Sequence, residues 1–181
     1  MHRRLFTGAL LATPWLAQAQ TDALAARLAA GACVVVLRHA QTDPGIGDPP
    51  GFRLDRCSTQ RNLSAQGRAQ AERLGQWFKS RGLQPGAVQS SAWCRCKDTA
   101  DLAFGRHTVW PALNSFFGEH RAKDAQTALL RAALKDVPSG GFEVWVTHQV
   151  NMTALTGEGI AMGEALVLDA RGTVVGRSTF A

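Results

Sequence analysis

The sequence predicts an α/β fold in which helices cover both faces of a mostly parallel sheet, giving three α/β/α layers. Strand-like and helix-like segments alternate along the chain, which favours a parallel sheet. Two strand candidates, residues 32–39 (ACVVVLRH) and 142–148 (FEVWVTH), are apolar almost throughout, as is typical of strands buried on both faces. The length of 181 residues fits one domain with one core.

Caps, turn residues and periodicity predict the remaining elements. Ser64 is a typical N-cap and Gly82 a typical stop, and apolar residues lie between them at helical spacing, so this segment is predicted to be a helix packed on the sheet. A hairpin is expected within residues 164–176, turning at Arg171-Gly172. Further helices are predicted over residues 21–31, 92–105 and 123–137, and further strands over residues 86–91 and 107–110.

Residues 43–61 are predicted to form a long loop, because the segment holds six proline and glycine residues within its first nine positions. A loop of this length inside a compact domain is usually functional or disordered. We expect it to shape the ligand site.

Residues 1–19 are typical of an export signal. A basic start at His2, Arg3 and Arg4 precedes a largely apolar run over residues 5–16, and Ala17-Gln18-Ala19 supplies the small-x-small cleavage pattern. We expect a mature domain of residues 20–181 that is periplasmic or secreted. The Arg3-Arg4 pair also resembles the twin-arginine signal, so Sec and twin-arginine export both stay open. The apolar run is shorter than the about 20 residues that span a bilayer, so stable membrane insertion is not expected.

The charge of the chain is mildly basic. Cleavage after residue 19 removes two arginines and no acidic residue, so the net charge of +6 becomes +4. No run of lysine and arginine occurs, and aromatic residues are not interleaved with basic ones, so a nucleic-acid partner is not expected. Part of the positive surplus is expected to lie where an anionic ligand binds.

The four cysteines indicate a disulfide if the protein is exported to an oxidising compartment. Cys57 can pair with Cys94 or with Cys96, and both pairings stay open. Cys33 starts an apolar strand and is expected to be a buried thiol. The cysteine spacing lacks the paired pattern of structural zinc sites, so no metal is expected.

Three predicted strands end in polar side chains, namely Arg38-His39, Ser90-Ser91 and Thr147-His148. Ligands of parallel sheets bind beyond the carboxyl ends of the strands, so we expect these residues to share one site. Arg95, in the helix that follows the second strand, adds a further guanidinium. Guanidinium forks fit phosphate oxygens and imidazole can act as a nucleophile, which together predict phosphoryl transfer.

Four segments carry a resemblance to a known family: LRHAQTD, SSAWCRCKDTA, VTHQVN and RNLSAQGRAQA. In this order they resemble the signatures of the histidine phosphatase superfamily, whose fold is the phosphoglycerate mutase-like fold. Ala40 stands where the family usually has glycine. The strings DRCSTQRNLS and VTHQVNMTALTG are most similar to small exported members related to lipopolysaccharide core heptose(II)-phosphate phosphatases.

The resemblance implies a role for each matching residue. His39 would be the nucleophile that becomes a phosphohistidine, and Arg38, Arg95 and His148 would surround the phosphoryl oxygens. Contacts to the substrate are expected from Thr42, Arg61 and Asn151. The implied enzyme needs no cofactor or metal, and its implied substrate is a small or envelope-linked sugar phosphate or another phosphomonoester.

Departures from the family concern the general acid. Ser115 stands where mutase-type relatives carry a glutamate, and Gln149 follows His148 where acid phosphatases carry an aspartate. Asp43 and Glu119 are the nearest replacements along the chain. A phenol-like, sugar-phosphate or phosphoramidate leaving group would need less help from an acid. The alternative function is a catalytically weak phosphate-binding protein of the same fold.

Overall fold

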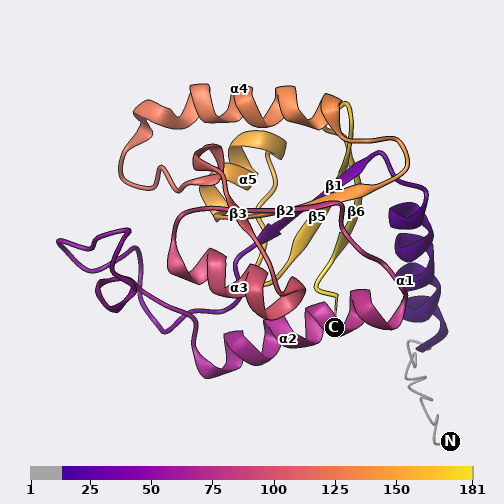
Figure 1. Ribbon diagram of the computed structural model, residues 1–181, viewed down its shortest axis with the longest axis horizontal. Helices are drawn as coiled ribbons and strands as arrows, with labels where there is room; N and C mark the ends of the chain where they lie inside the picture. The colour runs from indigo at the N-terminus through magenta and orange to yellow at the C-terminus, as the bar shows by residue number, and fades with distance from the viewer. Residues whose placement is uncertain (1–13, 181) are drawn as a thin grey trace, which may run out of the picture.

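The computed structural model describes residues 14–180, which form one six-stranded sheet between two layers of helices (Figure 1). The strand order is β3-β2-β4-β1-β5-β6. The first four strands are parallel, β5 is antiparallel to β1, and β6 is antiparallel to β5. The strands are β1 (Cys33–Arg38), β2 (Ala87–Ser90), β3 (Thr108–Val109), β4 (Phe142–Thr147), β5 (Ala165–Asp169) and β6 (Val174–Ser178). The predicted α/β class and the C-terminal hairpin are confirmed.

The helices are α1 (Pro14–Ala29), α2 (Ala65–Ser80), α3 (Cys94–Phe104), α4 (Lys123–Ala133) and α5 (Gln149–Thr156). Helices α4 and α5 cover one face of the sheet and α2 and α3 the other, with α1 at the side (Figure 1). Helix α1 begins earlier than the expected residue 21. Helix α5 was not predicted by caps or periodicity, because it has only eight residues and no side-chain N-cap.

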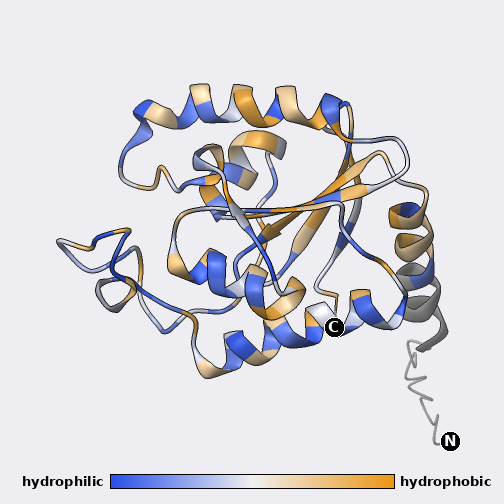
Figure 2. Ribbon diagram, viewed as in Figure 1, coloured by the Kyte–Doolittle hydropathy of each residue, from blue (hydrophilic) through white to orange (hydrophobic). Residues whose placement is uncertain are grey.

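The central strand β1 is buried on both faces, as its continuous apolar sequence predicts. Its side chains alternate between two core clusters: Val35 and Leu37 lie in the cluster under α2 and α3, whereas Val34 and Val36 lie in the cluster under α4 and α5. Figure 2 shows the hydrophobic strands enclosed by helices of mixed polarity. This burial fixes the position of the strand end that carries Arg38.

Helix α2 begins at the predicted N-cap and holds the chain that follows β1. The Ser64 hydroxyl accepts a hydrogen bond from the Gly67 amide at 3.1 Å, while the Ser64 amide donates to the Gln41 carbonyl at 3.1 Å. A Cβ atom on Gly67 would lie 1.8 Å from the Gln41 carbonyl oxygen, so only glycine allows this close approach. The start of α2 therefore sets the path of residues 40–42.

The expected export signal falls largely outside the described residues, which leave out positions 1–13, and its residues 14–19 begin α1. Leu24 and Leu28, which a chain starting at Gln20 would keep, are buried in the core. Among the described residues no helix is long and apolar enough to cross a bilayer.

Cys57 and Cys94 form a disulfide, which selects one of the two expected pairings. Cys33 and Cys96 are buried free thiols. The disulfide joins the loop of residues 43–61 to the first residue of α3. Within the part of the chain that the structure describes, no group of three or more metal-ligating side chains is found.

Replacing Gly67 with alanine tests the close contact between α2 and the chain after β1. The added methyl group must displace the Gln41 carbonyl, so we expect G67A to lower the free energy of unfolding by about 1–3 kcal/mol. Chemical denaturation measures this. The matched control is G140A, because nothing lies within 4 Å of a Cβ at Gly140. Equal stability of the two variants would contradict the account of this contact.

Candidate active site

The carboxyl ends of β1, β2 and β4 meet at one edge of the sheet, as expected. Arg38 pairs with Thr147 in the parallel ladder, and the His39 amide continues it by donating to the Thr147 carbonyl at 3.0 Å. The His39 and His148 rings consequently lie 5.5 Å apart between centroids, edge to face. The two histidines are therefore neighbours although 109 positions separate them in the sequence.

A cavity of about 610 Å³ lies at this edge. The four predicted catalytic residues, Arg38, His39, Arg95 and His148, all line it. Its other lining residues come mainly from the loop of residues 43–61, which extends beyond the sheet (Figure 1, left), and from residues 115–118. The cavity is therefore the candidate active site.

His39 is held as a neutral imidazole with one nitrogen available. Its Nδ1 lies 2.9 Å from the Ala40 carbonyl, which can only accept, so Nδ1 carries the proton and Nε2 keeps its lone pair. Burial lowers the pKa of His39 to about 3, and the charges of Arg95 and Arg38 act in the same direction against the Ala40 hydrogen bond. At neutral pH, Nε2 is thus an unprotonated nucleophile.

Side chains from two helices hold the chain beside His39. The Ala40 amide donates to the Thr99 hydroxyl at 3.0 Å, and that hydroxyl donates to the Arg95 carbonyl at 2.7 Å. The Gln41 amide donates to the Gln70 side chain at 3.0 Å. Thr99 of the second motif therefore positions the first motif.

His148 is buried and paired through Nε2. This nitrogen lies 2.8 Å from the Ser91 hydroxyl, which donates to the Asn114 side-chain oxygen at 3.3 Å. These contacts fix the orientation of the His148 ring on the cavity lining. Burial lowers the pKa of His148 well below its ordinary value, and the facing His39 adds to this, so His148 is a neutral ring.

Both motif arginines keep an unused donor. Arg38 Nη1 donates to the Ile160 carbonyl at 2.7 Å and to Gln149 at 3.1 Å, and Arg95 Nη1 and Nη2 bind Asp48. The Nε atoms of both arginines are buried without a hydrogen-bond partner. Both guanidinium groups line the cavity, and their positive charge suits an anionic ligand there.

Asp48 is the residue of the site that the sequence signals missed. Its oxygens lie 2.7 Å and 3.2 Å from Arg95 Nη1 and Nη2, and it also accepts from the Trp93 indole and the Arg61 amide. Burial alone would raise the pKa of Asp48, but the hydrogen bonds from Arg95, Arg61 and Trp93 outweigh it and lower the pKa. Ionised Asp48 therefore fixes the orientation of Arg95.

Arg61 lines the cavity, and its guanidinium also binds the loop. Its Nη1 donates to the Thr42 hydroxyl at 2.7 Å and to the Gly45 carbonyl at 2.9 Å, and its Nε donates to Gly47 at 2.9 Å. Thr42 is buried here and does not line the cavity. The structure thus places Thr42 as an anchor for Arg61.

Besides Thr42, three predicted site residues lie off the cavity. Asn151 is buried and donates to the Asn114 carbonyl at 3.0 Å, so it braces that turn. Asp43 and Glu119 are exposed and do not line the cavity, whereas Ser115 does. The geometry gives neither acid the place of a proton donor, because sequence proximity does not fix the direction of a loop side chain.

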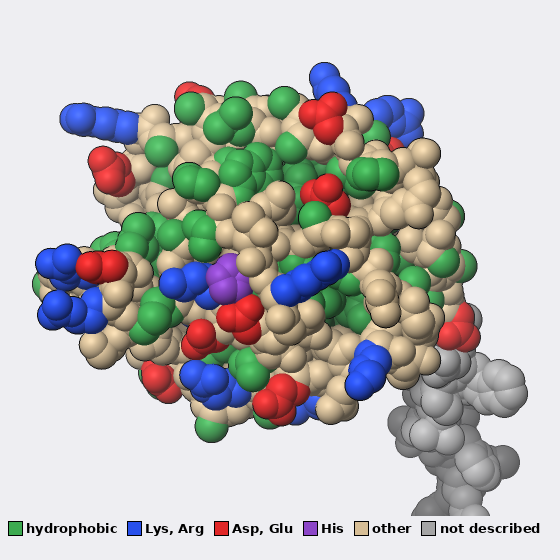
Figure 3. Space-filling model, in the orientation of Figure 1, with side chains coloured by type: hydrophobic (Ala, Val, Ile, Leu, Met, Phe, Trp, Pro, Cys, Tyr) green, Lys and Arg blue, Asp and Glu red, His purple; other side chains and the backbone are tan. Residues whose placement is uncertain are grey.

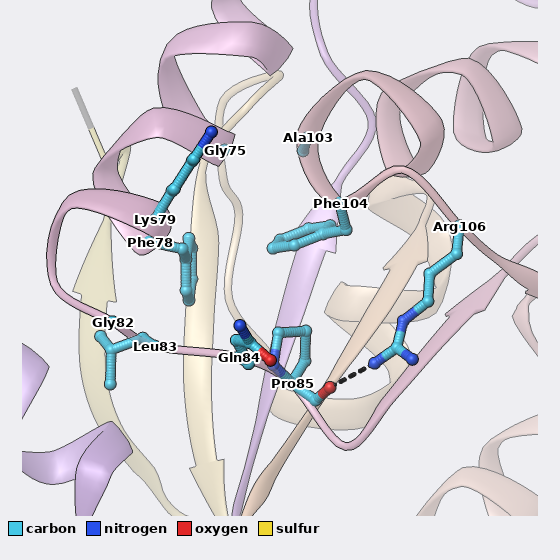
Figure 4. Close-up of a pocket in the computed structure, with 10 residues that line it drawn as sticks. All are labelled: Gly75, Phe78, Lys79, Gly82, Leu83, Gln84, Pro85, Ala103, Phe104 and Arg106. Carbon is cyan, nitrogen blue, oxygen red and sulfur yellow. Dashed lines mark hydrogen bonds between the residues drawn. The ribbon is translucent and has the colours of Figure 1, made fainter.

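A second cavity, of about 470 Å³, lies between α2 and α3 next to the start of β2 (Figure 4). Its arginine, Arg106, already donates to the Pro85 carbonyl at 2.5 Å. This second cavity lies at the amino end of β2, away from the strand ends where ligands of parallel sheets bind. We therefore assign the active site to the histidine cavity.

The surface charges of the face in Figure 3 are mixed: Lys and Arg side chains are spread over it with Asp and Glu side chains among them. The cavity differs, because its lining holds three guanidinium groups and one carboxylate. This excess of two positive charges, beside two neutral histidines, matches a phosphate dianion.

Comparisons with known proteins identify the family of the chain. Residues 34–158 match the family model described as the histidine phosphatase superfamily (branch 1). A comparison with curated protein sequences gives no match.

Solved structures with the same fold include three whose descriptions name a phosphatase. One, described as phosphohistidine phosphatase SixA from Agrobacterium tumefaciens, has a TM-score of 0.57 at 23% identity and covers 81% of this chain and 97% of that chain. Another, described as an alpha-ribazole-5'-P phosphatase from Escherichia coli str. K-12 substr. MG1655, has a TM-score of 0.60 at 17% identity, with coverages of 82% and 98%. A SixA structure complexed with tungstate has a TM-score of 0.55 at 16% identity, with coverages of 80% and 95%.

Replacing Asp48 with asparagine tests its hold on Arg95. A hydrogen bond between charged groups contributes about 1.5–3 kcal/mol, so D48N should raise the inhibition constant of inorganic phosphate at least about tenfold. Competitive inhibition of phosphatase activity measures it. The control is D55N, which changes an exposed aspartate of the same loop. Tighter phosphate binding by D48N would contradict this role, because it would mean that Asp48 competes with the ligand for Arg95.

Proposed function

Because the chain belongs to the histidine phosphatase superfamily, we propose that this phosphatase hydrolyses phosphomonoesters through a phosphohistidine at His39 and without a metal. The observation that carries the proposal is one cavity lined by His39, whose Nε2 is left free, and by the guanidinium-bearing residues Arg38 and Arg95. A nucleophile and donors for the phosphoryl oxygens are the two requirements of in-line phosphoryl transfer.

In the first step the lone pair of His39 Nε2 attacks phosphorus. The bond from phosphorus to the ester oxygen breaks, and that oxygen leaves with the bonding pair and takes up a proton. Arg38 and Arg95 stabilise the phosphoryl oxygens during the transfer, and His148 lies beside them on the cavity lining. The hydrogen bond from His39 Nδ1 to the Ala40 carbonyl stabilises the positive charge that develops on the ring.

In the second step water attacks the phosphohistidine. The P–N bond breaks and its electron pair returns to Nε2, while the proton of the water passes to the released phosphate. The sum is phosphomonoester plus water giving alcohol plus inorganic phosphate. His39 is regenerated as a neutral ring, in agreement with the low pKa that its burial imposes.

The tungstate bound by the SixA relative supports an oxyanion site in this fold. Tungstate is a tetrahedral oxyanion like phosphate. The guanidinium groups of Arg38 and Arg95 on the cavity lining offer donors for the same kind of ligand.

We also propose that the protein is exported and acts in the periplasm or outside the cell, on a small or envelope-linked phosphomonoester. The basic start and the Ala17-Gln18-Ala19 pattern support export, and the resemblance of the motifs suggests a sugar phosphate. Mass spectrometry of the exported protein tests the first part, since the cleaved chain should begin at Gln20.

A phosphate-release screen of the full chain over phosphomonoesters, with and without EDTA, tests the proposed chemistry. We expect hydrolysis that EDTA does not change and that H39A loses by at least about 10³-fold, because His39 is the proposed nucleophile. The control is H120N, which replaces an exposed histidine outside the cavity.

Activity retained by H39A would contradict the mechanism. Phosphate binding by the wild type without any turnover would instead favour the alternative function of a phosphate-binding protein. Circular dichroism of H39A establishes that its loss of activity is not a loss of fold.

A further inference from the structure

The active-site cavity has an apolar wall beside its charged floor. The wall consists of Ile46 and Phe52 from the long loop, Trp93 from the start of α3, and Phe117 from the segment before α4. The cavity volume of about 610 Å³ is much larger than a phosphoryl group, so the wall borders the space left for the leaving group.

The apolar wall is exposed to an unusual degree. Ile46 is 91% exposed, Phe117 is 61% exposed and Phe52 is 38% exposed. Of the seven large apolar side chains that are exposed among the described residues, these three line this one cavity. Clustered exposed apolar groups mark a place where a ligand covers them.

Contacts across the chain hold the apolar wall in place. The Phe117 ring lies against Gly47, where an added Cβ would be 3.5 Å from the ring. The Phe52 and Trp93 rings are 5.8 Å apart, and the Trp93 indole donates to Asp48 at 2.9 Å. The wall is thus tied to the same loop that orients Arg95.

The polar groups around the apolar wall are already paired. Asp48 accepts hydrogen bonds from the Arg61 amide and from Arg95, and Arg61 Nε donates to the Gly47 carbonyl. Gln149 accepts from Arg38 and donates to Thr153. The Ser115 hydroxyl accepts from the Phe117 amide at 3.2 Å. A leaving group rich in hydroxyls would find few free partners here, and unpaired polar groups weaken binding strongly. An apolar leaving group has no such cost.

The missing proton donor points the same way. The carboxylate on the cavity lining, Asp48, is ionised and bound to Arg95, so no carboxylic acid of the described residues lines the cavity to protonate the leaving oxygen. A phenolate leaves without full protonation because the pKa of a phenol is about 10, far below that of an aliphatic alcohol.

We propose that the leaving group of the natural substrate is aromatic, so that the substrate is a phosphate ester of a phenol or a larger aryl alcohol. The inference rests on the proposed phosphatase function and narrows its substrate class. The phosphoryl group binds at Arg38, Arg95 and His148, and the aryl ring packs on Ile46, Phe52 and Phe117. Sugar phosphates are then poor substrates, against the expectation from sequence resemblance.

The experiment compares 2-naphthyl phosphate, phenyl phosphate and a hexose phosphate with the full chain. Naphthol and phenol have similar acidity, so a difference between their esters reports contact with the wall. Four additional ring carbons on apolar surface should raise kcat/KM about tenfold or more for the naphthyl ester. F117A should reduce the ratio of kcat/KM for naphthyl phosphate to kcat/KM for phenyl phosphate to below about threefold. The matched control is L129A, an exposed leucine of α4 outside the cavity, which should leave the ratio unchanged.

Two outcomes would overturn the inference. One is a kcat/KM for the hexose phosphate equal to or above that of naphthyl phosphate, and the other is a naphthyl advantage that F117A does not reduce. Both leave the phosphatase function standing. Absence of hydrolysis for every ester, or hydrolysis that survives H39A, would instead refute the proposed function.

Discussion

The site depends on the parallel alignment of β1 with β4. Their register sets Arg38 opposite Thr147, and the next residue of each strand is a histidine. A shift by one residue would turn the side chains of one strand to the opposite face and separate the two rings. The buried alternation of Val34, Val35, Val36 and Leu37 between two core clusters prevents such a shift. Packing of the core therefore sets the geometry of the chemistry.

Burial gives this arrangement its electrostatic character. Two histidines beside three arginines are held neutral because the dry site and the surrounding positive charge both disfavour the imidazolium. Asp48 offsets part of that charge and occupies one side of Arg95, while the Nε of Arg95 stays unpaired. The lining of the site thus carries a net positive charge, which a phosphoryl group can neutralise. The Cys57–Cys94 disulfide joins the loop of Asp48 to the helix of Arg95.

Much of this architecture could be predicted from the sequence because it depends on local patterns. Continuous apolar runs identify β1 and β4, and polar residues at their ends identify Arg38, His39 and His148. Asp48 could not be found in this way, because its partner Arg95 lies 47 positions away and the loop between them has no regular structure. Asn151 matched a motif, but its side chain turned out to brace a backbone turn. Sequence neighbours of a motif do not necessarily share its cavity.

The apolar wall could not be predicted from the sequence for the same reason. Ile46 and Phe117 belong to segments without periodicity, and only the structure shows that both border one cavity, with the Phe117 ring against Gly47. Family membership fixes the phosphoryl end of the substrate, whereas these loops determine the other end. Fold and motif therefore constrain the reaction more than they constrain the leaving group.

The most direct test of the account is to trap the covalent intermediate. The wild-type chain, mixed with an aryl phosphate and quenched in alkali within the first turnover, should carry one phosphoryl group, stable in base and labile in acid, on the peptide that contains His39. NMR of that peptide should place the phosphorus on Nε2, the nitrogen that the Ala40 hydrogen bond leaves free. A phosphoryl group on another residue, or on Nδ1, would contradict the assignment of the nucleophile.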